Sequence, residues 1–88
     1  MINKEKAHEI ADRYLIEYVG NLVSPGEPSF DSKIKVCIVP IFHKSKVTTF
    51  RLSEIIIDSE GSIVYVPTKD QLEEMDDKKF LQKVELKI

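Results

Sequence analysis

The stretch from Ile55 to Thr68, IIIDSEGSIVYVPT, decides the fold because two apolar runs are joined there by a short acidic turn. Branched and aromatic residues on either side of the turn are typical of β-strands. Asp58 can accept a hydrogen bond from the backbone two residues further on, and Gly61 can adopt the positive φ that such a turn requires. The stretch therefore predicts an antiparallel hairpin in which the acidic residues serve the turn.

The segments upstream of this hairpin extend it into a sheet. Residues 33–42 (KIKVCIVPIF) and 47–57 (VTTFRLSEIII) are rich in branched residues, and residues 62–66 (SIVYV) form the last strand of the hairpin. Short polar loops between these segments predict a three-stranded antiparallel meander. Pro40 cannot donate a hydrogen bond to a neighbouring strand, so the first strand is expected to lie at an edge there or to carry a bulge.

An amphipathic helix is predicted over residues 4–19. Asn3 precedes it as a suitable N-cap, and Gly20 follows where a residue with positive φ commonly ends a helix. The connection over residues 20–32 is rich in proline and glycine and is expected to form a loop. Apolar residues at helical spacing give the helix a single stripe, formed by Ala7, Ile10, Ala11, Tyr14, Leu15 and Tyr18.

A second helix is predicted over residues about 69–80. Thr68 and Gln71 have the spacing of a capping box, in which each side chain bonds the other residue's backbone amide. The tail over residues 83–88 alternates apolar and charged side chains. This alternation fits a fourth strand, and a continued helix is nearly as well supported.

These elements predict one α+β domain over residues 1–88, with an N-terminal helix packed on a three-stranded or four-stranded antiparallel sheet and a C-terminal helix. Both faces of the sheet are expected to be apolar. Cys37 and Val39 would point to one face, while Val36 and Ile38 would point to the other. One helix can cover only one face, so the second face requires the C-terminal helix, the tail strand or a second chain.

The bulk properties restrict the class of protein. The chain has 88 residues, one cysteine and a net charge of −2. A single cysteine allows no internal disulfide and is typical of a reducing compartment. The charged start of the chain carries no apolar stretch of signal-peptide length, and the longest apolar run, residues 36–42, is too short to span a bilayer. A cytoplasmic protein without a membrane segment is predicted.

One span of the chain is basic and has no acidic residue between Asp31 and Glu54. Lysine-rich sheets with exposed aromatic side chains are typical of single-strand nucleic-acid binders. The net acidic charge and the core-like spacing of Phe50 argue against this function. The residues that would contact nucleic acid are Lys33, Lys35, Lys44, Lys46 and Arg51.

No group of residues has the spacing of a catalytic or metal site. A calcium loop starting at Asp58 would need further oxygen ligands and a closing glutamate, whereas a strand follows. Cys37 and His43 lie on one face of a strand but about 20 Å apart, and Cys37 is expected to be a buried, inert thiol among apolar neighbours. We therefore predict no enzyme activity, no metal and no cofactor.

Two segments resemble a PepSY-type domain of the cystatin-like group. They are the helix segment AHEIADRYL (residues 7–15) and the hairpin IIIDSEGSIVYV (residues 55–66), and the resemblance covers residues 4–66. It implies a helix lying across a curved antiparallel sheet. Members of that family are mostly exported or membrane-associated, and some are thought to inhibit peptidases.

The function predicted from these features is a non-catalytic interaction module that binds a protein partner or itself. The alternative is a nucleic-acid-binding or regulatory protein that uses the basic span from Lys33 to Arg51. Because both faces of the sheet are apolar and the tail alternates, a homodimer is expected about as strongly as a monomer covered by its second helix.

Overall fold

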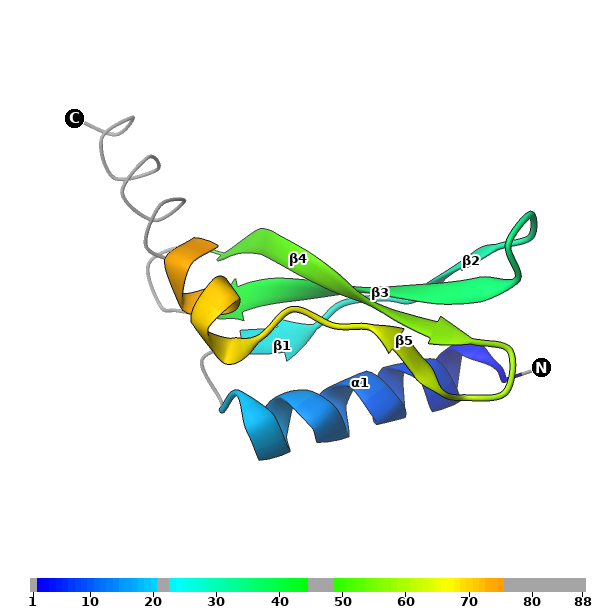
Figure 1. The fold of residues 1–88 in the computed structure, drawn as a ribbon, viewed down its shortest axis with the longest axis horizontal. Coiled ribbons are helices and arrows are strands. Elements are labelled where there is room, and N and C mark those ends of the chain that lie inside the picture. Colours follow the sequence, from blue (N-terminus) through cyan, green and yellow to red (C-terminus); the bar gives the residue numbers. More distant parts are fainter. Residues whose placement is uncertain (1, 21–22, 45–48, 76–88) are drawn as a thin grey trace.

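A computed structural model describes residues 2–20, 23–44 and 49–75 of this chain. It confirms the α+β class, with a helix on one face of an antiparallel sheet and a further short helix over residues 69–75 (Figure 1). The predicted residues 76–80 of that helix and the predicted strand 83–88 lie outside the described residues. The other elements are α1 (Lys4–Tyr18), β1 (Val23–Pro25), β2 (Ser29–Asp31), β3 (Val36–Lys44), β4 (Thr49–Asp58) and β5 (Ile63–Tyr65).

The predicted meander is present as β3, β4 and β5, which pair antiparallel in chain order. The sheet has five strands, however, because β1 and β2 both pair with the free edge of β3. The prediction of a loop over residues 20–32 was therefore wrong. Strands of three residues are too short to show an alternating pattern, and the prolines and glycine around them hide it further.

The first predicted strand begins three residues too early, since β3 starts at Val36. Residues 32–35 form a turn instead. The Asp31 carboxylate accepts hydrogen bonds from the backbone amides of Lys33 (2.9 Å) and Ile34 (3.3 Å), and Lys35 has a φ of 55°. Asp31 thereby reverses the chain between β2 and β3, a role that the alternation of KIKV concealed.

Pro40 lies within β3, opposite Glu54 of β4. Its carbonyl accepts a hydrogen bond from the amide of Gly26 (2.8 Å), and Gly26 lies in the gap between β1 and β2. Because the nitrogen and the carbonyl of one strand residue point to the same side, the missing N–H of Pro40 also faces this gap. The ladder shifts register beyond it, between Ile41 and Phe42, which is the irregularity expected of a proline in a strand.

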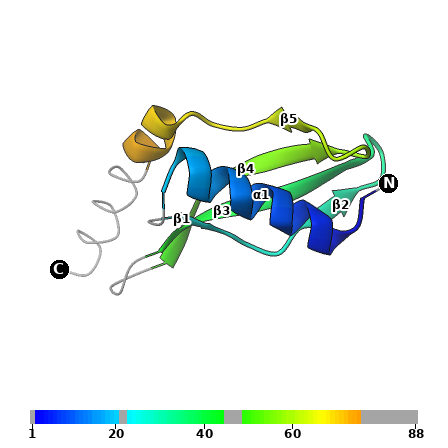
Figure 2. The same ribbon diagram turned by 90° about the horizontal axis from the view of Figure 1, so that it is seen from below.

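α1 lies along one face of the sheet (Figure 2). Its N-cap Asn3 accepts a hydrogen bond from the amide of Lys6 (2.7 Å), and it ends at Tyr18, one residue before the predicted end. Gly20 follows with a φ of 119°, as predicted. Ala7 and Ala11 are completely buried against the sheet, and their small side chains allow the helix backbone to approach it closely.

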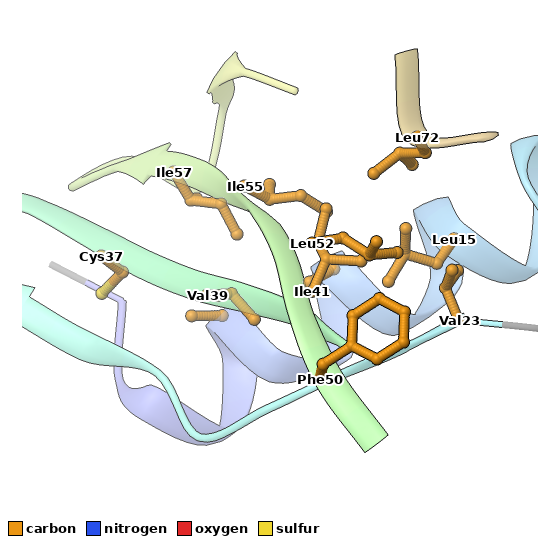
Figure 3. Packing of buried hydrophobic residues seen from close by; sticks show 12 residues of the cluster. Leu15, Val23, Cys37, Val39, Ile41, Phe50, Leu52, Ile55, Ile57 and Leu72 are labelled. Carbon is orange, nitrogen blue, oxygen red and sulfur yellow. The ribbon is translucent and has the colours of Figure 1, made fainter. Parts of the chain in front are cut away.

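The core lies between α1 and the sheet, and the helix over residues 69–75 closes one end of it (Figure 3). Leu72 projects from that helix towards Leu15 and Leu52 and is 2% exposed. The predicted capping box fixes the start of this helix: Gln71 donates its amide to the Thr68 hydroxyl (3.1 Å), and Thr68 donates its amide to the Gln71 side chain (3.0 Å).

The hairpin between β4 and β5 has the predicted chemistry. The Asp58 carboxylate accepts hydrogen bonds from the amides of Glu60 (3.0 Å) and Ser62 (2.9 Å), and Gly61 has a φ of 90°. A Cβ atom on Gly61 would make only ordinary contacts, 3.5 Å from Ile2 and 3.6 Å from Ile10. Any cost of a larger residue at this position therefore comes from the backbone conformation.

We predict that Gly61→Val lowers the free energy of unfolding by about 1–2 kcal/mol, because a branched residue disfavours positive φ. Equilibrium unfolding in urea measures this loss. Glu60→Gln is the matched control and should change stability by less than about 0.5 kcal/mol, since the side chain is exposed and only its amide serves the turn. Equal losses in the two variants would contradict the assignment.

Candidate interaction surfaces

The face of the sheet opposite α1, here called the outer face, is apolar along its centre. Register and burial assign its residues: on β3 they alternate with Cys37, Val39 and Ile41, which point into the core. Both described helices pack on the core side, so no described helix lies over the outer face (Figures 1 and 2). The apolar side chains of the outer face are Val36, Ile38, Pro40, Phe42, Ile56 and Tyr65.

Except for Val36, which is 9% exposed, these side chains are only partly removed from solvent. Ile38, Pro40, Phe42 and Ile56 are half-buried by their neighbours within the sheet, and Tyr65 is 47% exposed. By contrast, Ile55, a neighbour of Ile56 in the same strand, is fully buried. The prediction of two apolar faces is confirmed, and the helix over residues 69–75 joins α1 on the covered side through Leu72.

A row of paired residues crosses the outer face. Ser29 of β2 pairs with Ile38 of β3, Ile38 with Ile56 of β4, and Ile56 with Tyr65 of β5. At the β2 end of this row lies a shallow hollow of about 390 Å³ that is lined in part by Ser29, Asp31 and Ile38. The row therefore begins at a depression and ends at the half-exposed Tyr65, which also lines a hollow with Pro67, Gln71 and Met75.

Two charged side chains of the outer face form an ion pair, whereas Asp31 and Asp58, both opposite Val36, lie at the other end of the face and bind turn amides. Arg51 lies opposite Phe42, and its guanidinium is 3.0 Å from the Glu54 carboxylate, which lies opposite Pro40. An ion pair of two exposed side chains contributes little stability. It does place a neutral polar border beside the apolar centre, as is common around protein interfaces.

The basic residues predicted to contact nucleic acid are not brought together. Lys33 and Lys35 are exposed in the turn between β2 and β3, at one end of the sheet. Arg51 lies near the start of β4, at the other end, about 20 Å away along the strand. The side chain of Lys44 and all of Lys46 lie outside the described residues. Phe50, one of the candidate stacking rings, is 6% exposed and belongs to the core.

A second groove lies between α1 and β5, and the sequence did not predict it. Its apolar lining residues are Ile10, Tyr14, Tyr18 and Ile63, and the rings of Tyr14 and Tyr18 lie 4.8 Å apart. Charged residues of α1 complete the lining, namely Lys6, Glu9, Arg13 and Glu17. The predicted apolar stripe on α1 is wider than the part of the helix that the sheet buries. This excess width is the sequence signal that could have predicted the groove. At about 230 Å³, the groove is smaller than the ~300–1,000 Å³ of typical small-molecule sites.

Cys37 and His43 do not form a catalytic pair. Cys37 is 3% exposed within the core, whereas the ring of His43 stacks on Phe50 at a centroid distance of 4.7 Å. Within the described part of the chain, no three His, Cys, Asp or Glu side chains are arranged to hold a metal ion. The Asp58 carboxylate is engaged by the hairpin amides, in agreement with its predicted role in the turn.

Comparison with protein-family models, with curated proteins and with solved structures gives no match to this chain. The PepSY-type resemblance therefore stays a prediction. Among the described residues, no helix combines the length and the apolar character needed to cross a membrane.

We predict that the Cys37 thiol of the native protein reacts slowly with a thiol reagent and rapidly once the protein is unfolded, because the core excludes the reagent. Labelling followed by mass spectrometry, with and without urea, measures the two rates. Native labelling as fast as in urea would show that Cys37 is accessible and would reopen a reactive role for it.

Proposed function

We propose that this chain is a non-catalytic interaction module that binds a protein partner or a second copy of itself through the outer face. The observation that carries the proposal is the position of both described helices on the other face of a sheet that is apolar on both sides. Each apolar side chain that a partner buries fully contributes roughly 1.5–3 kcal/mol. Contiguous exposed apolar patches commonly mark interaction sites.

A cytoplasmic location and the absence of a cofactor belong to the same proposal. A lone cysteine buried in the core suits a compartment where disulfides do not form. A PepSY-type relationship is compatible with a helix on an antiparallel sheet and with the hairpin from Asp58 to Gly61. The inhibition of peptidases attributed to some members of that family would itself be a protein-binding function.

Nucleic-acid binding through the basic span has less support. Lys33 and Lys35 are separated from Arg51 by most of the length of β4, and the Arg51 guanidinium already pairs with Glu54. A phosphate backbone binds tightly only where several cations act together, and this binding weakens steeply with salt.

The proposal can be tested with a photo-cross-linking amino acid placed at Ile38, because the adjoining hollow leaves room for a larger side chain. Expressed as the full chain in its native cells, this variant should form discrete protein adducts on illumination. The control carries the same group at Ile16, which is 64% exposed on α1 and therefore lies on the helical side of the molecule. Ile56→Lys, added to the Ile38 variant, should abolish the adducts.

The mass of the adduct separates the alternatives. An adduct of two chains indicates self-association, and an adduct of another mass indicates a different protein partner. Absence of any adduct at position 38, or the same adducts at positions 38 and 16, would contradict the proposal. A product that disappears on nuclease treatment would favour nucleic-acid binding instead.

A further inference from the structure

We infer that the outer face is covered by a second copy of this chain, with the two sheets packed face to face and each Tyr65 seated in the hollow beside Ile38 of the other copy. The inference rests on the proposed function and names the partner. It follows from three properties of the outer face, namely its shape, its chemistry and its size.

The shape of the outer face is self-complementary. The row across the sheet begins with the hollow at Ser29 and ends with the exposed ring of Tyr65, with Ile38 and Ile56 between them. In the dimer, a two-fold axis would lie between the two facing sheets, parallel to their strands. This axis places the row of the second copy opposite that of the first in the reverse order. Each Tyr65 then meets a hollow, and each Ile38 meets an Ile56. One surface patch therefore supplies both halves of the contact.

The chemistry of the hollow suits a tyrosine. Ser29 and Asp31 carry polar side chains on its wall, and Ile38 supplies an apolar side. A tyrosine ring entering it would bury its apolar body beside Ile38 while its hydroxyl remains close to polar partners. The pair between Arg51 and Glu54 is neutral as a unit. The other charges of the face lie at its far end, where Asp31 and Lys33 line the hollow and Asp58 lies opposite Val36.

The size of the face suits a weak dimer. β3 and β4 have nine and ten residues, whereas β1, β2 and β5 have three each. With strands about 4.8 Å apart and a rise of ~3.3 Å per residue, such a face covers roughly 440 Å². Two such faces bury about 900 Å² in total, which lies in the range of weak, transient interfaces. Two sheets of this kind pack about 10 Å apart, with their strands inclined by about 30°. A dimer of low affinity is expected.

Sedimentation equilibrium of the full chain at hundreds of micromolar should give a mass that approaches twice the 10.1 kDa of one chain, and dilution should shift the mass towards one chain. Ile56→Lys should raise the dissociation constant by a factor of about 100 or more, because a substitution in a two-fold interface acts twice. Ile16→Lys is the matched control on the exposed side of α1 and should leave the constant unchanged.

The seating of Tyr65 needs a separate test, since Ile56→Lys reports only on the centre of the face. We would mix two single variants, Ser29→Cys and Tyr65→Cys, and treat them with a short bifunctional thiol reagent. A cross-linked heterodimer should form in the mixture at a higher yield than homodimers of either variant alone. The buried Cys37 should contribute little to the reaction.

A mass of one chain that stays constant over a tenfold rise in concentration would overturn the inference. In that case, slow hydrogen exchange and low accessibility at Ile38 and Ile56 would assign the face to residues 76–88 of the same chain. Full accessibility together with a heterologous adduct at position 38 would assign it to another protein and leave the proposed function standing. A dimer that forms no link between positions 29 and 65 would overturn the arrangement.

Discussion

The pairing of β3 with β4 is the constraint on which the rest of this structure depends. In the observed register, Cys37 lies opposite Ile57 and Val39 opposite Ile55, and all four side chains face α1. Because side chains alternate along a strand, a slip of one residue would move this whole set to the other face. The hairpin turn at Asp58 helps to hold the register, since its carboxylate and carbonyl bind the amides that close the turn.

The helices then decide which apolar face is covered. Ala7 and Ala11 bring α1 close to β1 and β3, and Leu15 and Leu72 meet above the same side of the sheet. Two helices on one face give a continuous core but leave Ile38 and Ile56 without a helix above them in the described part of the chain. An uncovered apolar face of this kind needs no special residue, because it follows from the side on which the described helices pack.

Local chemistry explains what the sequence could predict. The N-cap at Asn3, the capping box of Thr68 with Gln71 and the turn from Asp58 to Gly61 depend on residues only a few positions apart, and all three occur as predicted. β1 and β2 were not predicted, because three-residue strands exist only through pairing with the edge of β3. The partner of β1 is distant in sequence and leaves no local pattern, whereas β2 pairs with β3 across the turn of residues 32–35, which the alternation of KIKV concealed.

The outer face could also be predicted only in part, because only its local features leave a pattern in the sequence. Alternation along β3 indicated two apolar faces. The face on which the helix over residues 69–75 packs could not be predicted, because it depends on the packing of Leu72 in the core. The hollow beside Ile38 depends on the path of β2 and was equally inaccessible to the sequence. The basic span shows that residues of one short sequence segment need not lie close together in the fold. Lys33 and Arg51 lie at opposite ends of the pair formed by β3 and β4.

The most direct test compares Ile55→Ala with Ile56→Ala by urea unfolding at about 1 μM protein, where association is weak. The two isoleucines are neighbours in β4 and differ only in the face to which they point. We expect Ile55→Ala to lower the free energy of unfolding by about 2–5 kcal/mol, because it opens a cavity in the core. Ile56→Ala should lower it by about 1 kcal/mol or less. Losses of equal size would contradict an uncovered outer face, because Ile56 would then be buried within a single chain.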